Sequence, residues 1–242
     1  MIPKIVNQIW MQGEVPQKYS LNVQSIKDKN PSWTYRLWNE KSIREVVSKL
    51  GQKYLDKYDG FKLLHQRVDM GRIALLYESG GVSVDTDVEA IKGFDSLPDL
   101  QTSDFIVSRK SHTNDINNAT ILVSKNNPIL KGLLDYMLNL PDCKSYQSNF
   151  SCVTNTTGPK VFNEYLKQYK DQITVLDNSY LEPCNFEEGC SLPQNAILNH
   201  KHELSWINPM HKKLLQIGNK YKWRIACGII LIVILIIIFR KQ

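Results

Sequence analysis

The segment from Asp69 to Asp87 constrains the fold of this chain more than any other part of the sequence. It combines an apolar pattern of helical period, a pair of glycines and a short β-like run that ends in Asp85 and Asp87. Asp69 and Arg72 lie one turn apart at the start of the helical part. The glycine pair ends the helix and allows a tight turn. The strand that follows delivers both carboxylates at its C-terminal end, where ligands bind in open α/β sheets.

These two carboxylates, separated by a single residue, indicate a metal site. Like charges this close together repel each other unless a cation lies between them. Oxygen ligands favour Mg²⁺ or Mn²⁺, and such ions commonly carry the phosphates of a substrate. An isolated Asp-x-Asp also occurs by chance in solvated loops, so the preceding helix and glycine pair supply much of the specificity.

The remaining pattern of helices and strands predicts an α/β fold with a Rossmann-like sheet. We expect strands over residues 2–10, 35–38, 82–84, 88–91 and 104–108, and helices over residues 16–29, 40–50, 52–59, 129–139 and 160–170. No Gly-x-Gly-x-x-Gly or Walker loop occurs in the sequence. Any bound phosphates would therefore be held by a metal and by side chains.

From Asp69 to Asp87 the chain resembles glycosyltransferase family 32, a family of DXD-type sugar-transfer enzymes. The family includes initiating α-1,6-mannosyltransferases and inositol-phosphorylceramide mannosyltransferases, and the glucosylating domain of clostridial toxins is a more distant likeness. Its pattern is approximately Asp-x-x-Arg-Tyr-x-x-Leu-Tyr-x-x-Gly-Gly-x-Tyr-x-Asp-x-Asp. The residues that match it here are Asp69, Arg72, Leu75 or Leu76, Tyr77, Gly80, Gly81, Asp85 and Asp87. Further segments that resemble the family end at Trp10 and Trp38, surround Asn118 and Thr157, and run from His200 to Trp206.

The resemblance implies a GT-A fold, with a mixed sheet flanked by helices, and a Mn²⁺ (or Mg²⁺) site. It implies that Asp87 binds the metal directly and that Asp85 reaches it through water or holds the ribose. The resemblance also implies His200 as a further ligand, ahead of His202. Neutral imidazole suits Mn²⁺ better than Mg²⁺. The alternative for both histidines is an ordinary surface position.

The resemblance also implies a set of residues that bind the nucleotide sugar. Asp69 and Arg72 would position the nucleoside and the sugar, and Asn118 would hydrogen-bond a sugar hydroxyl. Trp10 would stack on the base, although a Trp at this place also packs well against a sheet. Asn118 could instead be an ordinary turn residue or a glycan acceptor. Ser205 and Trp206 would contact the leaving diphosphate.

The expected function is that of a membrane-anchored, metal-dependent glycosyltransferase that uses a nucleotide-diphosphate sugar, with GDP-mannose favoured, and retains anomeric configuration. The acceptor would be a glycan or a glycolipid. Three departures from the family pattern, Asn7, Ile73 and Ser83, support the alternative of a decayed, membrane-tethered binder. The net charge of +6 alone does not indicate nucleic acid, because its densest basic group, at residues 212–224, precedes an apolar run.

That apolar run, residues 225–239, predicts a transmembrane anchor. As a helix it would be about 22 Å long, against a hydrocarbon core of roughly 30 Å, so the span would be short. A buried core segment is the alternative. The resulting division is a catalytic domain over residues 1–210, a basic segment over 211–224 and the anchor. The basic residues before the anchor predict that the domain lies on the cytosolic face, and we expect no signal peptide before it.

Three glycosylation sequons, at Asn118, Asn149 and Asn155, support the opposite, lumenal or external, placement. The cysteines decide little. Cys143, Cys152, Cys184 and Cys190 could pair in an oxidising compartment, and Cys227 lies in the expected anchor. Their spacing does not suit a zinc site, and we expect free, partly buried thiols.

Overall fold

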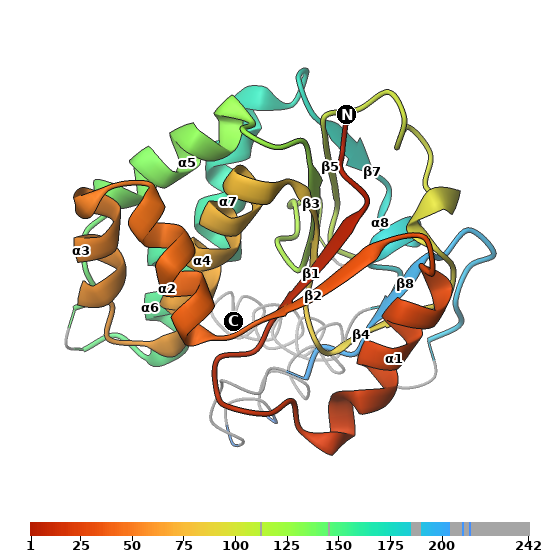
Figure 1. Cartoon of the computed structure of the whole chain (residues 1–242), viewed down its shortest axis with the longest axis horizontal. Helices are drawn as coiled ribbons and strands as arrows, with labels where there is room; N and C mark the ends of the chain where they lie inside the picture. The colour runs from red at the N-terminus through yellow and green to blue at the C-terminus, as the bar shows by residue number, and fades with distance from the viewer. Residues whose placement is uncertain (112, 145, 185–189, 204–209, 211–212, 214–242) are drawn as a thin grey trace, which may run out of the picture. The chain divides into compact units, whose positions relative to one another are not determined.

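The computed structural model describes residues 1–111, 113–144, 146–184, 190–203, 210 and 213 (Figure 1). The chain divides into two compact units, one formed by residues 1–185 and 190–202 and one by residues 186–189 and 203–242. All helices and strands given below belong to the first unit. The expected anchor at residues 225–239 lies outside the described residues. Within the described residues, the structure contains no helix with the length and apolarity needed to cross a bilayer.

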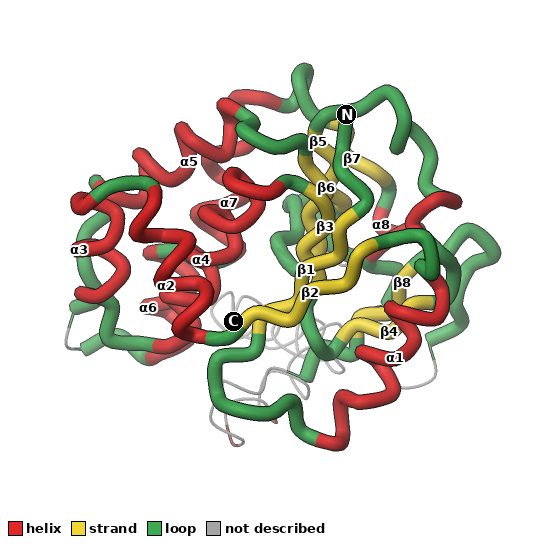
Figure 2. The backbone as a smooth tube through the Cα atoms, viewed as in Figure 1, coloured by secondary structure: helices red, strands yellow, loops and turns green. Residues whose placement is uncertain are grey.

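A six-stranded mixed sheet forms the centre of the first unit (Figure 2). Its strands in spatial order are β2 (Thr34–Trp38), β1 (Ile5–Ile9), β3 (Gly81–Val84), β6 (Thr120–Val123), β5 (Phe105–Ser108) and β7 (Thr174–Leu176). β1 runs parallel to β2 and β3, β5 runs parallel to β7, and β6 is antiparallel to β3 and β5. The predicted mixed α/β sheet is therefore confirmed, although β6 and β7 were not among the expected strands.

A second sheet pairs β4 (Val88–Ala90) with β8 (Leu198–His200) in antiparallel orientation. The α-helices are α1 (Ser20–Lys29), α2 (Glu40–Lys49), α3 (Gln52–Gly60), α4 (Leu64–Ser79), α5 (Pro128–Leu138), α6 (Asn149–Thr156), α7 (Pro159–Leu166) and α8 (Asn178–Leu181). Short 3₁₀ helices are η1 (Gln17–Tyr19), η2 (Phe94–Ser96) and η3 (Lys167–Tyr169). The helix expected over residues 16–29 is thus a 3₁₀ turn followed by α1, and that expected over 160–170 is α7 followed by η3.

Helices cover the two faces of the main sheet unequally (Figure 1). α2, α3, α4, α5 and α7 pack on one face and share a large apolar core that includes Ile43, Leu75, Leu130 and Phe162. α4 is buried on most of its circumference, as expected for a helix enclosed by other helices and a sheet. α1, η2 and α8 lie on the other face, around a smaller core that includes Ile26 and Phe94.

The turn between α4 and β3 requires both of its glycines. Gly80 and Gly81 have φ of +65° and +92°, in the left-handed region that side chains other than glycine disfavour. A Cβ atom at Gly81 would also lie 2.4 Å from the carbonyl oxygen of Ile5 on β1. The glycine pair therefore reverses the chain and lets β3 enter the sheet directly beside β1. This placement sets the position of Asp85.

Candidate active site

The site begins where β1 and β3 end. These strands are parallel neighbours, so Trp10 after β1 and Asp85 after β3 lie at the same edge of the sheet. Asp87 immediately precedes β4, and the register of β4 with β8 pairs Val88 with His200. The backbone N–H of Lys201 also donates to the carbonyl oxygen of Asp87, over 3.0 Å. The small second sheet therefore brings His200 to the Asp85–Asp87 pair.

Asp85, Asp87 and His200 form a cluster suited to a divalent cation. One ligand atom from each lies within 4.8 Å of the others. His200 Nε2 is 3.4 Å from Asp87 Oδ1, and the side chains of both residues are mostly buried. Two carboxylates and one imidazole form a mixed oxygen and nitrogen donor set, which suits Mn²⁺ and also accepts Mg²⁺. The residues present thus fit the metal that the sequence predicts.

The electrostatics of this cluster are those of a buried anionic site. Burial raises the pKa of Asp85, the nearby Arg72 opposes that rise, and the neighbouring carboxylate of Asp87 adds to it. Burial by itself lowers the pKa of His200, but the carboxylates of Glu182 and Asp87 outweigh it and raise that pKa well above its usual range. The cluster therefore attracts positive charge, as repulsion between nearby carboxylates predicts.

Arg72 on α4 connects the cluster to the residues expected to hold the sugar. Its guanidinium donates to Asp85 Oδ1 and to the carbonyl oxygen of Asn118. Asp69, one turn earlier, accepts hydrogen bonds from Asn118 Nδ2 at 3.3 Å and from the Thr157 hydroxyl at 3.1 Å. Burial raises the pKa of Asp69 to about 7, and the positive charge of Arg72 acts in the opposite direction. The structure thus brings Asp69, Arg72 and Asn118 together beside Asp85, while their roles towards a ligand stay predictions.

Trp10 is half-buried and packs against Tyr19, with ring centroids 5.5 Å apart. Its backbone N–H donates to the carbonyl oxygen of Trp38. Its indole Nε1 is buried and has no hydrogen-bond partner among the described residues. The ring thus has a packing partner and an unsatisfied donor, and both interpretations of Trp10 stay open.

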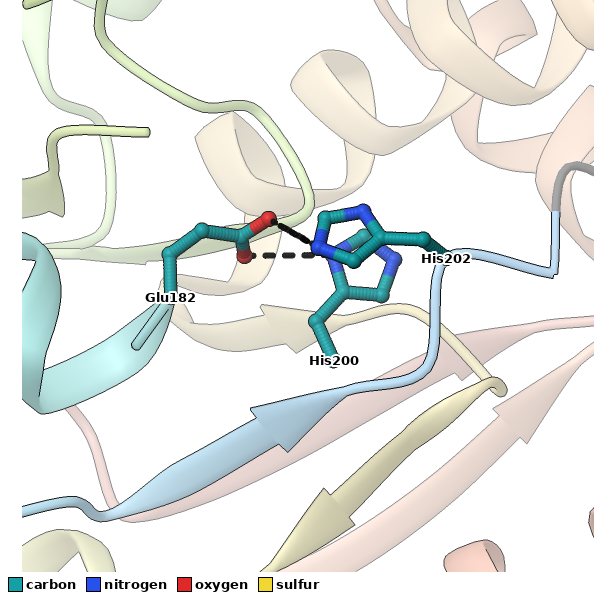
Figure 3. Close-up of side chains that lie close together, drawn as sticks. All are labelled: Glu182, His200 and His202. Carbon is teal, nitrogen blue, oxygen red and sulfur yellow. Dashed lines mark hydrogen bonds and ion pairs between the residues drawn. The ribbon is translucent and has the colours of Figure 1, made fainter. Parts of the chain in front are cut away.

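The structure adds residues that the sequence did not single out. Gln8 Nε2 donates to the carbonyl oxygen of Asp85 at 3.1 Å, and Tyr35 donates to Gln8 Oε1 at 2.8 Å. Thr157, which lies in a segment that resembles the family but was given no side-chain role, donates a hydrogen bond from its hydroxyl to Asp69. Glu182, just after α8, contacts His200 and His202 (Figure 3). No local signal marks Glu182, because its partners are 18 and 20 residues away in sequence.

Other predicted site residues have different outcomes. His202 contacts Glu182 and lies outside the Asp85–Asp87–His200 cluster. Ser205 and Trp206 lie outside the described residues. The expectation of free thiols was wrong, because Cys143 pairs with Cys152 and Cys184 pairs with Cys190 as disulfides. The fold brings the Cα atoms of these pairs to 5.2 and 5.9 Å, within bridging range, which sequence spacing alone does not reveal.

Comparisons with known proteins agree with this site. Residues 16–104 match the family model of the glycosyltransferase sugar-binding region containing a DXD motif. An uncharacterized glycosyltransferase of Acanthamoeba polyphaga mimivirus is 29% identical over 237 residues, which cover 91% of this chain and 90% of the viral protein. Inositol phosphoceramide mannosyltransferase 3 of Schizosaccharomyces pombe is 31% identical over 159 residues, covering 65% of this chain and 43% of the relative. The chain spans only about half the length, or less, of the yeast relatives it matches.

Solved structures share the fold. A glycosyltransferase involved in glycosylation of the major capsid of PBCV-1 superimposes with a TM-score of 0.53 at 13% identity, covering 83% of this chain and 94% of that one. The catalytic domain of alpha-toxin from Clostridium novyi gives a TM-score of 0.52 at 10% identity, covering 89% and 82%. The mixed sheet flanked by helices is thus that of GT-A enzymes. This chain is a glycosyltransferase, and its residues 16–104 match the DXD-containing sugar-binding region.

Proposed function

We propose that this chain is a metal-dependent hexosyltransferase that takes its sugar from a nucleotide-diphosphate donor, GDP-mannose, and passes it to a glycan or glycolipid. The observation that carries the proposal is the convergence of Asp85, Asp87 and His200, from the end of β3, the start of β4 and β8, on one small volume. Arg72, Asp69 and Asn118 lie directly beside it. This arrangement combines ligands for a cation with hydrogen-bonding groups for a sugar.

Each residue has a distinct part in this proposal. Asp87 and His200 would hold the metal, and Asp85, one oxygen of which accepts a hydrogen bond from Arg72, would act through water or on the ribose. A bound Mn²⁺ would neutralise negative charge on the departing diphosphate, as a Lewis acid does. Asp69, oriented by Asn118 and the Thr157 hydroxyl, would accept hydrogen bonds from the donor.

Two further contacts complete the donor site in this proposal. Trp10 would stack on the base, and its buried indole N–H has no hydrogen-bond partner among the described residues. Ser205 and Trp206 would contact the diphosphate. The family resemblance supports retention of anomeric configuration by attack on the same face.

The donor and acceptor are proposed from the relatives. Several of the yeast relatives are named as inositol phosphoceramide mannosyltransferases, which supports a mannosyl donor and a lipid-linked acceptor. The expected anchor at residues 225–239 would keep the domain near a membrane, consistent with a glycolipid acceptor. Full activity on soluble oligosaccharides together with none on glycolipids would contradict this assignment.

The two disulfides indicate on which side of a membrane the catalytic domain lies. Persistent disulfides are typical of oxidising compartments, so the two pairs speak against the cytosolic placement expected from charge and for the lumenal or external one. The exposed sequon residues Asn149 and Asn155 are consistent with this side. In protein from its native cell, we expect the four paired cysteines to resist alkylation until a reductant is added. Labelling of all four without reductant would restore the cytosolic placement.

The main alternative is a decayed binder without catalytic activity. It rests on the departures from the family pattern at Asn7, Ile73 and Ser83. All three are interior positions, exposed by 0, 2 and 1%, and they pack in the sheet and in the core around α4. The polar residues of the site itself match the family, which favours the enzyme.

A thermal-shift panel of nucleotide sugars, with and without Mn²⁺, tests the proposal. A donor at 100 times its Kd should stabilise the folded chain by about 2.7 kcal/mol. We expect this shift with GDP-mannose and Mn²⁺, together with slow donor hydrolysis, and we expect Asp87→Asn to abolish both. Glu89→Gln, which alters a carboxylate that pairs with Lys201, is the matched control and should behave as the wild type.

Two results would change the conclusion. A shift with UDP-sugars alone would replace GDP-mannose as the donor and leave the metal site in place. Binding of nucleotide sugars without any metal-dependent hydrolysis or transfer would favour the decayed binder.

A further inference from the structure

We propose that Glu182 is a positioning residue that orients His200 towards the Asp85–Asp87 pair and thereby gives the site its preference for Mn²⁺ over Mg²⁺. This inference rests on the metal site of the proposed function. Glu182 lies outside the Asp85–Asp87–His200 cluster but forms a second group of possible metal ligands with His200 and His202, and the resemblance assigns it no role.

The two nitrogens of the His200 ring have separate partners. Nδ1 lies 3.0 Å from Glu182 Oε1 and 3.1 Å from Oε2 (Figure 3). Nε2 is 3.4 Å from Asp87 Oδ1. When Nδ1–H donates to Glu182, Nε2 is left as the metal-binding nitrogen and faces the aspartates. A carboxylate on the far side of a ligating histidine commonly sets the ring orientation and makes the ring a stronger ligand.

Burial makes this contact hard to break. Glu182 is only 3% exposed, and a buried carboxylate without a partner is strongly destabilising. Rotation of the His200 ring away from Asp87 would remove the contacts of Nδ1 with both oxygens of Glu182 and leave that buried carboxylate with His202 as its remaining imidazole partner. The ring is therefore expected to hold its orientation before any metal arrives.

His202 supports the same orientation. Its Nε2 lies 3.1 Å from Glu182 Oε1 and 2.9 Å from the carbonyl oxygen of Cys184. Its ring stacks on that of His200, with centroids 4.0 Å apart and an angle of 27° between the planes. The lone pairs of two stacked imidazoles cannot both point at one ion in their ring planes, so His202 acts as a support for His200 and Glu182.

The backbone holds both sides of the contact. Glu182 follows α8, and its N–H donates to the carbonyl oxygen of Asn178. His200 lies on β8, which is paired with β4, and Ile197 N–H donates to the carbonyl oxygen of Tyr180 on α8. α8 and β8 are thus joined directly, which keeps Glu182 and His200 in a constant relation.

The consequence concerns which metal binds. Mn²⁺ and Mg²⁺ both favour oxygen ligands, but Mn²⁺, as a transition metal, accepts an imidazole nitrogen more readily than Mg²⁺, which keeps its waters. Loss of such an outer carboxylate typically costs 10- to 100-fold in metal affinity. If Glu182 acts through His200, this loss should fall on Mn²⁺ and largely spare Mg²⁺. A purely structural role would weaken both ions alike.

The test measures Mn²⁺ binding to the full chain by electron paramagnetic resonance, with Mg²⁺ as competitor. Glu182→Leu, which has no acceptor, should bind Mn²⁺ about 10- to 100-fold more weakly with little change in Mg²⁺ affinity. Glu182→Gln should lose less, because its amide oxygen can still accept from His200. His200→Ala should lose at least as much Mn²⁺ affinity as Glu182→Leu, and the double variant should show no loss beyond that of His200→Ala. Glu89→Gln should match the wild type.

The possible failures are distinguishable. If the wild type and Asp87→Asn both bind no Mn²⁺, the proposed metal site itself is wrong. If the wild type binds Mn²⁺, Asp87→Asn does not, and Glu182→Leu keeps the wild-type preference for Mn²⁺, the role of Glu182 is wrong. Should Glu182→Leu fail to fold by circular dichroism, Glu182→Gln decides: an unchanged preference overturns the inference, and a reduced one supports it.

Discussion

Replacement of Arg72 by Met tests the central ion pair of the site. Met has a flexible side chain of similar reach, so it retains much of the packing of the Arg stem and removes the guanidinium. That guanidinium donates to Asp85 and to the carbonyl oxygen of Asn118, and the Arg72 side chain is only 7% exposed. The substitution therefore leaves the Asp85 carboxylate without its positive partner.

The structure sets the size of the effect. Removal of one partner from a buried ion pair costs about 3–5 kcal/mol. The Asp85 side chain is 31% exposed, so water can partly solvate the stranded carboxylate, and we expect a value near the lower end, about 3 kcal/mol. For a chain of this size that corresponds to a fall in Tm of about 6–12 °C. Without Arg72, which lowers the pKa of Asp85 against the effect of burial, that pKa should also rise.

The assay is thermal unfolding followed by circular dichroism, with Arg44→Met as the matched control. Arg44 makes two hydrogen bonds to Asp59, of 2.9 and 2.6 Å, but 52% of its side chain is exposed. Exposed pairs contribute little and are screened by salt, so this variant should melt close to the wild type. If Arg72→Met and Arg44→Met lower Tm equally, burial does not set the strength of the Arg72–Asp85 pair and the reasoning is refuted.

Three further predictions address the turn, the buried acid and the base platform. Gly81→Ala should lower the free energy of unfolding by about 2–5 kcal/mol, from left-handed strain and from the approach of its Cβ to Ile5. Gly51→Ala is the control, because Gly51 has φ +114° but open space where its Cβ would lie. In urea unfolding it should lose only the stability that the strained backbone costs. Equal losses in the two variants would show that the approach of the Gly81 Cβ to Ile5 does not matter. Because burial raises the pKa of Asp69 from 3.8 to about 7, the folded protein keeps a proton there that the unfolded chain releases, so stability should fall as the pH rises from 3.8 towards 7. The free energy of unfolding of Asp69→Asn, measured in urea, should fall less over this pH range than that of the wild type. Parallel pH profiles of the two proteins would show that Asp69 does not titrate in this way. Trp10→Leu should weaken nucleotide binding, measured by calorimetry, by about 5- to 150-fold if the ring stacks on the base, whereas unchanged affinity would leave Trp10 a packing residue.

The segment that ends at Asp87 was predictable because its signals are local. Apolar spacing defined α4, the glycine pair defined its end, and the β-like run defined β3. The strand end then placed Asp85 at the ligand-binding edge of the sheet. β6, by contrast, was not expected as a strand, because its short apolar run has no period of its own and is ordered by pairing with β3 and β5.

The partners of the site residues depended on tertiary structure. Asp69 and Thr157 are 88 residues apart and Arg72 and Asn118 are 46 apart, so their contacts depend on how α4, α6 and the β5–β6 connection pack. The contact of Glu182 with His200 and the two disulfides also depend on tertiary packing, and sequence spacing did not predict them.

The sequence by itself determined the helix, the turn, the strand and the carboxylates from Asp69 to Asp87, and through them the class of chemistry. Only the tertiary structure decided which histidine reaches those carboxylates and what holds it there. The physical reason is that helix periods and glycine turns act over a few residues, whereas the pairing of β4 with β8 and the burial of Glu182 exist only once distant segments have packed.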